Sequence, residues 1–175
     1  MKLLHEYFVT SLERMGIAGL PGDLSGPGRF RFSVGGEEKI FLGDHRRPNG
    51  AYIENAADRA VALYEALPGP PDILRIDDCQ DLPFLPSPEE RLGASCYWTL
   101  PKEPPWLRKL FREIIRSELD PAGIEGLTGN VYFLDTFRDV LFHLYDDRGC
   151  DIVAATPETL ASLRDSCRDW IVETD

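Results

Sequence analysis

The stretch that decides the fold covers residues 131–154, VYFLDTFRDVLFHLYDDRGCDIVA. Within it, residues 131–134, 140–145 and 150–154 are runs of β-branched, aromatic and aliphatic side chains, each of strand length and bounded by polar residues. Side chains alternate between the two faces of a strand, and the middle run places large apolar residues on both faces. The pattern therefore predicts three consecutive strands joined by two short turns, with the middle strand at the centre of a sheet.

The second of these turns, Asp146-Asp147-Arg148-Gly149, is charged. It fits a tight turn in which Asp146 accepts backbone hydrogen bonds and Gly149 takes a left-handed conformation. One interpretation is functional: together with His143, the two carboxylates and the guanidinium hold an ion or recognise a charged partner. The other is structural: Asp146 caps the turn, Arg148 pairs with a carboxylate, and Gly149 supplies backbone freedom.

The block FHLYDDRGCDIVA, preceded by VYFLD and followed by a terminal helix, resembles the C-terminal signature of a bacterial family of domains without an assigned function, marked by Tyr-Asp-Asp-Arg-Gly. The segment AYIENAADRAVALYEAL is similar to a helix of the same family. The resemblance spans residues 30–171 and implies a small bacterial cytosolic domain. It brings no catalytic residue with it, because the family offers none.

Apolar periodicity predicts further elements on both sides of this stretch. In chain order they are a helix over residues 3–15, a Gly- and Pro-rich loop over 16–28, a hairpin of strands 29–34 and 39–42 around Gly35-Gly36, a helix over 51–67 capped by Asn49, strands over 72–76 and 95–100, a helix starting at Pro104-Pro105, and a last helix starting at Thr156-Pro157. Runs of strands between single helices favour an α+β fold, with a mixed or mainly antiparallel sheet of about six to seven strands covered by about four helices. A single domain over residues 1–175 is expected, with residues 1–28 as an N-terminal helix and loop and residues 29–175 as the main body.

The net charge of −11 in 175 residues argues against some partners. An excess of carboxylates repels nucleic acid and anionic membrane, so neither is expected as a partner. It favours a basic protein partner, although acidity also serves solubility alone. The sequence has no run of transmembrane length and no secretory signal, which predicts a cytoplasmic protein.

Metal and cofactor sites are not expected. The four cysteines form no Cys-x-x-Cys pair and the chain has three histidines, which is unlike a structural zinc site. Asp77, Asp78 and Asp81 offer three carboxylates in five positions, but they lack the glycine and the spaced glutamate of a calcium loop. The sequence also has no Gly-rich phosphate loop and no serine at a strand-to-helix elbow.

Two classes of function remain. The first is a non-catalytic acidic cytosolic binding protein, such as an immunity protein that neutralises a basic bacterial toxin. The second is a small enzyme or ligand-binding domain, in which His143 acts as a base and Asp147 with Arg148 orients the ligand. The candidate binding residues are Asp77, Asp78, Asp81, His143, Tyr145, Asp146, Asp147 and Arg148, with Cys150 beside them as a buried thiol. No residue is assigned a catalytic role.

Overall fold

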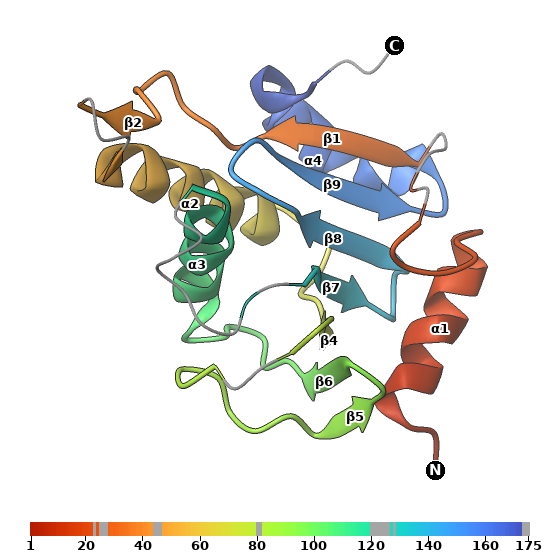
Figure 1. Cartoon of the computed structure of the whole chain (residues 1–175). Coiled ribbons are helices and arrows are strands. Elements are labelled where there is room, and N and C mark those ends of the chain that lie inside the picture. Colours follow the sequence, from red (N-terminus) through yellow and green to blue (C-terminus); the bar gives the residue numbers. More distant parts are fainter. Residues whose placement is uncertain are drawn as a thin grey trace.

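A seven-stranded antiparallel sheet forms the centre of the molecule (Figure 1). The computed structural model describes residues 1–22, 24, 28–43, 47–79, 82–119, 127 and 129–172. Among these residues, the strands lie in the order β1-β9-β8-β7-β4-β6-β5. Their bounds are β1 (Arg29–Ser33), β4 (Ile73–Ile76), β5 (Glu90–Leu92), β6 (Ser95–Thr99), β7 (Val131–Asp135), β8 (Val140–Leu144) and β9 (Gly149–Ala154). Two further short strands, β2 (Phe41–Leu42) and β3 (Arg47–Pro48), pair with each other outside this sheet.

The three strands predicted from residues 131–154 are confirmed as β7, β8 and β9. They are neighbours in the sheet, with Phe133 opposite Phe142 and Phe142 opposite Ile152. Every residue of β7 and β9 is buried, and β8 lies between them. The interior position of β8, with a strand on each side, agrees with the apolar residues on both of its faces.

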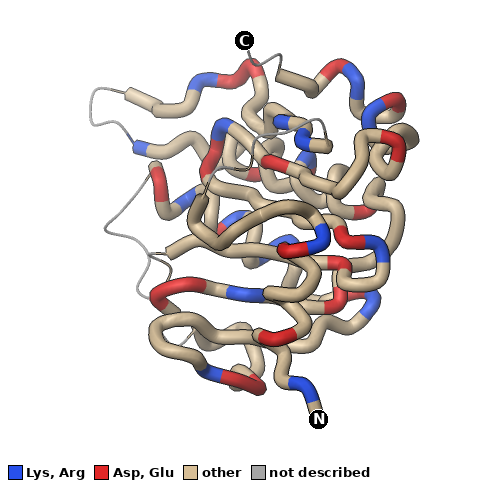
Figure 2. Tube along the Cα trace, turned by 90° about the vertical axis from the view of Figure 1, so that its right-hand side faces the viewer, with Lys and Arg blue, Asp and Glu red and all other residues tan. Residues whose placement is uncertain are grey.

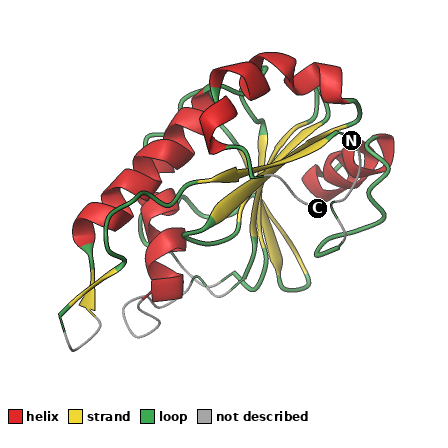
Figure 3. Ribbon diagram, turned by 90° about the horizontal axis from the view of Figure 1, so that it is seen from above, coloured by secondary structure: helices red, strands yellow, loops and turns green. Residues whose placement is uncertain are grey.

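Helices cover both faces of the sheet (Figure 3). On one face, α2 (Gly50–Glu65) packs against α3 (Leu107–Leu119), and α4 (Ala161–Ser166) adds to the same core. Tyr64 of α2 and Phe111 of α3 lie against Phe133 and Phe142, with ring centroids between 5.3 and 5.9 Å apart. The α+β class, with six to seven strands and about four helices, is therefore confirmed.

Among the described elements, α1 (Leu4–Arg14) is the helix that covers the opposite face. Phe8 and Leu12 of this helix pack on a second apolar cluster that includes Tyr97 and Leu134. Glu90 of β5 fixes the start of α1, because its carboxylate accepts hydrogen bonds from the backbone N–H groups of Leu4 (2.7 Å) and residue 5 (3.3 Å). The helix lies beside β5 and β6, so the far half of this face is left to other residues.

One predicted connection was wrong, and one strand was not predicted. The turn at Gly35-Gly36 does not join two paired strands: β1 pairs with β9, and β2 pairs with β3. The buried strand β9 needs a neighbour on its outer side, and β1 supplies it with Phe32 fully buried. Local turn residues carry no information about such a distant partner. The short strand β5 was also missed, because Glu90-Arg91-Leu92 lacks an alternating apolar pattern.

The last helix starts where it was predicted, but it is broken into three parts. A 3-10 turn, η1 (Pro157–Leu160), precedes α4, and a second, η2 (Arg168–Trp170), follows it. The hydroxyl of Thr156 does not cap the backbone and lies 3.2 Å from the hydroxyl of Thr159. At the start of α2, Asn49 does act as expected, accepting a hydrogen bond from the N–H of Ala51 (3.1 Å). Within the described ranges, no helix combines the length and apolar character needed to cross a membrane.

Candidate functional site

A row of polar and aromatic side chains crosses the sheet on the face that carries α1. It follows the strand register from one strand to the next: Tyr97 (β6), Arg75 (β4), Tyr132 (β7), His143 (β8), Asp151 (β9) and Arg31 (β1). The rings of Tyr132 and His143 are in contact, with centroids 4.5 Å apart. Because side chains alternate along each strand, the intervening residues face the apolar core under α2 and α3. One face of the same strands is thus apolar, and the other has a polar row.

Asp151 is the centre of charge in this row. Its carboxylate accepts a hydrogen bond from Nη2 of Arg29 (3.0 Å) and another from Nε of Arg31 (3.0 Å). The Asp151 side chain is 6% exposed, whereas the two arginines are 21% and 36% exposed. The hydrogen bond with Asp151 raises the pKa of Arg31, which keeps that guanidinium charged. Two cations therefore face one buried anion.

His143 stands next to this ion pair as a neutral imidazole. Burial lowers its pKa to about 4, although the carboxylates of Asp151, Asp77 and Asp146 act in the opposite direction. Its Nε2 atom is buried and has no hydrogen-bond partner among the described residues, and the same holds for Nε of Arg29. A buried polar atom without a partner costs free energy, so both atoms favour a hydrogen-bonding group beside them.

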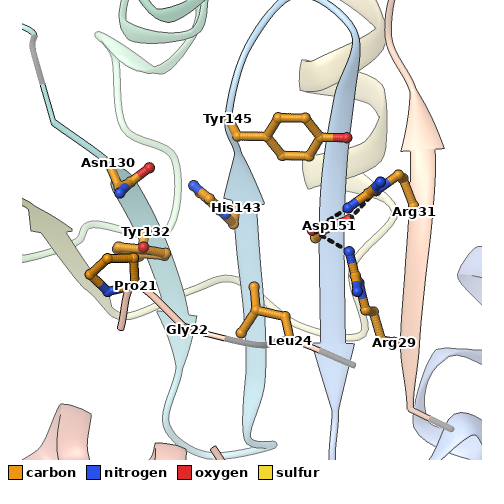
Figure 4. A pocket seen from close by; sticks show the side chains of 10 residues that line it. All are labelled: Pro21, Gly22, Leu24, Arg29, Arg31, Asn130, Tyr132, His143, Tyr145 and Asp151. Carbon is orange, nitrogen blue, oxygen red and sulfur yellow. Dashed lines mark hydrogen bonds and ion pairs between the residues drawn. The ribbon is translucent and has the colours of Figure 1, made fainter. Parts of the chain in front are cut away.

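These residues line a pocket of about 270 Å³, which we name the sheet-face pocket (Figure 4). The charged and aromatic side chains of the sheet form its floor, and Pro21 and Leu24, from the segment after α1, line it as well. Tyr145 follows β8 and lies under the guanidinium of Arg31, which is 5.4 Å from the centre of the ring. The pocket thus combines guanidinium groups, aromatic rings and a neutral imidazole.

The charged turn has internal partners for most of its predicted side chains. The carboxylate of Asp146 accepts hydrogen bonds from the backbone N–H of Arg148 (2.7 Å) and from its Nε (2.8 Å), as the structural interpretation expects. The carboxylate of Asp147 accepts a hydrogen bond from the hydroxyl of Tyr52 on α2 (2.9 Å). Both aspartates are buried, while the Arg148 side chain is 79% exposed. Of the predicted cluster, the sheet-face pocket contains His143 and Tyr145 but neither aspartate.

The expected left-handed conformation of Gly149 was wrong. Gly149 is the first residue of β9, and its φ is not positive. A Cβ at this position would overlap the hydroxyl of Tyr145 and lie 3.2 Å from the carbonyl oxygen of Phe32. The residue is therefore a glycine because neighbouring atoms approach it closely, and one of those neighbours is a side chain of the pocket.

Asp77 and Asp78 line a second hollow beside the sheet-face pocket, and we name it the acidic hollow. It has a volume of about 380 Å³, it also contains Glu118, and it shares Pro21, Asn130 and Tyr145 with the pocket. Asp77 accepts hydrogen bonds from Nε of Arg75 and from the hydroxyl of Ser95, both at 2.7 Å. Asp78 is exposed. Asp81 lies outside the described residues.

Sequence reasoning missed the charged residues of the pocket, Arg29, Arg31 and Asp151. In the sequence the two arginines lie on the polar face of the alternating strand 29–34, and Asp151 lies within the strand predicted over residues 150–154. One signal was available: Asp151 is a lone carboxylate in the apolar run of residues 150–154, and such a residue requires a cationic partner. The alternating Arg29-Phe30-Arg31 pattern offers two cations on one face, but only the fold brings it next to β9.

Comparisons with known proteins place the chain in a family. Residues 76–175 match the family described as "Domain of unknown function (DUF3885)". "Uncharacterized protein YnaE" of Bacillus subtilis (strain 168) is 34% identical over 44 residues, which are 25% of this chain and 21% of that protein. The match thus spans about a fifth of the length of the curated relative. No solved structure matches the chain. The expected resemblance to a bacterial family without an assigned function is confirmed: because the matched residues are more than half of its length, the chain belongs to the DUF3885 family.

Proposed function

We propose that this domain is a non-catalytic binding protein that holds a small anionic ligand in the sheet-face pocket. The observation that carries the proposal is the arrangement of Arg29 and Arg31 around the single carboxylate of Asp151. One anion cannot neutralise two cations, so the described lining of the pocket keeps a net positive charge. In an acidic protein such a site is selective, because the surrounding carboxylates repel anions from other parts of the surface.

Binding is favoured over catalysis by the chemistry of the neighbouring groups. A histidine with a pKa of about 4 is a weak base near neutral pH. The thiol of Cys150 is fully buried in the core on the other face of the sheet, and burial raises its pKa well above the ordinary value. The groups expected to assist His143 have other contacts, since Asp147 binds Tyr52 and Arg148 binds Asp146.

A thermal-shift titration of the purified chain with a panel of small carboxylates and phosphates tests this proposal. We expect at least one anion to raise the melting temperature, because a ligand that binds only the folded state stabilises it. In Arg31→Gln, the affinity for that anion should fall about tenfold or more, because a charge-assisted hydrogen bond is lost. Arg168→Gln is the matched control, because this arginine is 76% exposed and lies outside the pocket. The proposal is contradicted if no anion in the panel raises the melting temperature, or if Arg31→Gln binds the anion as tightly as the wild type.

A basic protein partner in the bacterial cytoplasm, such as a toxin neutralised by this protein, is the second candidate. The acidic hollow favours it, because Asp77, Asp78 and Glu118 line this hollow and its described lining includes no lysine or arginine. Asp78 and Glu118 are exposed and therefore open to a cationic side chain. Elsewhere, basic and acidic segments are interspersed along the chain (Figure 2), so the hollow is a more specific feature than the net charge alone.

Recovery of partners from a cell lysate at low and high salt tests the second candidate. Attraction between exposed charges is screened by salt, so a toxin-like basic partner should be retained only at low salt. The double variant Asp78→Lys with Glu118→Lys should lose it, whereas Glu13→Lys, an exposed glutamate on α1, should not. Retention that ignores both salt and charge reversal at the hollow would exclude this candidate.

A further inference from the structure

Asp151 limits the kind of anion that the sheet-face pocket can accept. The Nε and Nη2 atoms of Arg31 lie 3.0 and 3.5 Å from the two carboxylate oxygens of Asp151. This edge of the guanidinium therefore already binds an anion. Nη2 of Arg29 is engaged in the same way. Phosphate groups are typically bound by the paired N–H donors of such an edge. A ligand in this pocket meets only the remaining donors.

The charge balance around the pocket also disfavours a phosphate group. Its described lining contains Arg29, Arg31 and Asp151 as charged residues, which leaves a single net positive charge beside a neutral His143. Two further charged pairs adjoin the pocket residues: Arg75, whose guanidinium lies over the ring of Tyr132, pairs with Asp77, and Arg148 pairs with Asp146. The adjoining acidic hollow adds the exposed carboxylates of Asp78 and Glu118. A monoanion is neutralised here, whereas a dianion would carry excess charge towards those carboxylates.

The remaining surface of the pocket is aromatic. The ring of His143 lies between those of Tyr132 and Tyr145, with centroid distances of 4.5 and 5.7 Å. Aromatic faces pack well against planar apolar groups. A volume of about 270 Å³ admits a small molecule with one ring and one acidic group.

We infer that the sheet-face pocket selects a small ring-bearing monocarboxylate over a phosphate ester. The inference rests on the proposed function and gives its ligand a chemical class. The carboxylate meets the free N–H groups of Arg29 and Arg31, and the ring packs against Tyr132, His143 and Tyr145. Asp151 is the specificity-determining residue, because it occupies donors and cancels a charge that a phosphate would need.

Calorimetric titration of the full chain with benzoate and phenyl phosphate tests the inference, because the two probes share a ring and differ in the charge of the acidic group. At about pH 7.5, where phenyl phosphate is largely a dianion, we expect benzoate to bind about tenfold more tightly. Asp151→Asn keeps the shape of the side chain and removes its charge. This variant should reduce or reverse the ratio of the benzoate affinity to the phenyl phosphate affinity. Arg168→Gln should leave the ratio as it is in the wild type.

A second measurement keeps the inference testable if Asp151→Asn does not fold. Between about pH 7.5 and about pH 5.8, the monoanion of phenyl phosphate rises from a few per cent to roughly half of the total, because its second pKa is about 6, while benzoate stays ionised. The affinity of the wild type for phenyl phosphate should therefore rise severalfold and that for benzoate should stay constant. His143 remains neutral over this range, since its pKa is about 4.

The outcomes separate the inference from the proposed function. If phenyl phosphate binds at least as tightly as benzoate at the higher pH, the inference fails and the proposed function stands. If neither probe binds while another small anion raises the melting temperature, the ring-bearing class is wrong and the pocket still binds anions. If no anion binds at all, both are overturned.

Discussion

At the scale of single residues, His143 makes the stability of the protein depend on pH. Its pKa is about 4 in the folded protein and about 6.5 in an unfolded chain, so the unfolded state takes up a proton first as the pH falls. The stabilisation is therefore complete above about pH 6.5 and is lost as the pH falls towards 4. We expect the free energy of unfolding to decrease by roughly 1–2 kcal/mol between about pH 7 and about pH 5.

Urea unfolding at these two pH values measures the effect, and His143→Phe is the matched variant because its ring keeps the contact with Tyr132. The decrease should be much smaller in that variant. Glu54, Glu90 and Asp139 also have lowered pKa values, but their ordinary values are 4.5 or less, so they titrate below this range. An equal decrease in both proteins would show that His143 is not the group responsible.

Residue roles could be predicted from the sequence where the partner is close in the chain. The hydrogen bonds between Asp146 and Arg148 join residues two positions apart, and turn chemistry was enough to expect them. The partner of Asp147 is Tyr52, and the partners of Asp151 are Arg29 and Arg31, all more distant in the sequence. No local pattern identifies such pairs. The candidate site was therefore only partly predicted: His143 and Tyr145 were found, and the three charged residues beside them were not.

At the scale of elements, periodicity located strands and helices but not their neighbours. The apolar spacing in residues 131–154 predicted β7, β8 and β9, because consecutive strands joined by short turns pair with each other. For β1 the same rule predicted a partner in residues 39–42, and the rule failed. Pairing with β9 buries Phe32 of β1 completely. The free energy of this burial favours the distant strand β9 over a neighbour joined by a short turn.

The helices on the two faces of the sheet also differ in how far the sequence predicted their positions. Small and apolar residues along α2 and α3 predicted helices that pack on a sheet, as they do. The sequence gives no sign that α1 covers only part of the opposite face. That outcome depends on where Glu90 of β5 fixes the start of the helix, and β5 itself has no apolar pattern. The position of the pocket therefore follows from an element that was not predicted.

At the scale of the whole molecule, the part of the chain that matches the family lacks elements that its own strands and helices contact. Residues 76–175 begin at the last residue of β4 and lack β1, α1 and α2. Without them β9 loses its outer neighbour and α3 loses the helix it packs against. We expect a fragment of residues 76–175 to show poor dispersion of its amide NMR signals and no cooperative thermal transition, in contrast to the full chain.

Anion binding by the same fragment is a second measurement. Arg29 and Arg31 lie outside residues 76–175, so the fragment should not bind any anion found for the full chain. Mixing it with residues 1–75 should restore part of the signal dispersion if the two pieces associate through β1 and β9. A fragment that melts cooperatively on its own would contradict the dependence on β1, α1 and α2.

The pairing of β1 with β9 also sets the order of events during synthesis on the ribosome. Translation produces the two arginines of β1 first, and their partner Asp151 on β9 follows 122 residues after Arg29 and 120 residues after Arg31. A nascent chain therefore holds an uncompensated pair of cations and an unpaired strand until β9 has left the exit tunnel. The sheet-face pocket therefore forms only when β1 pairs with β9, so the anion binding proposed above requires a chain in which these two strands have already paired.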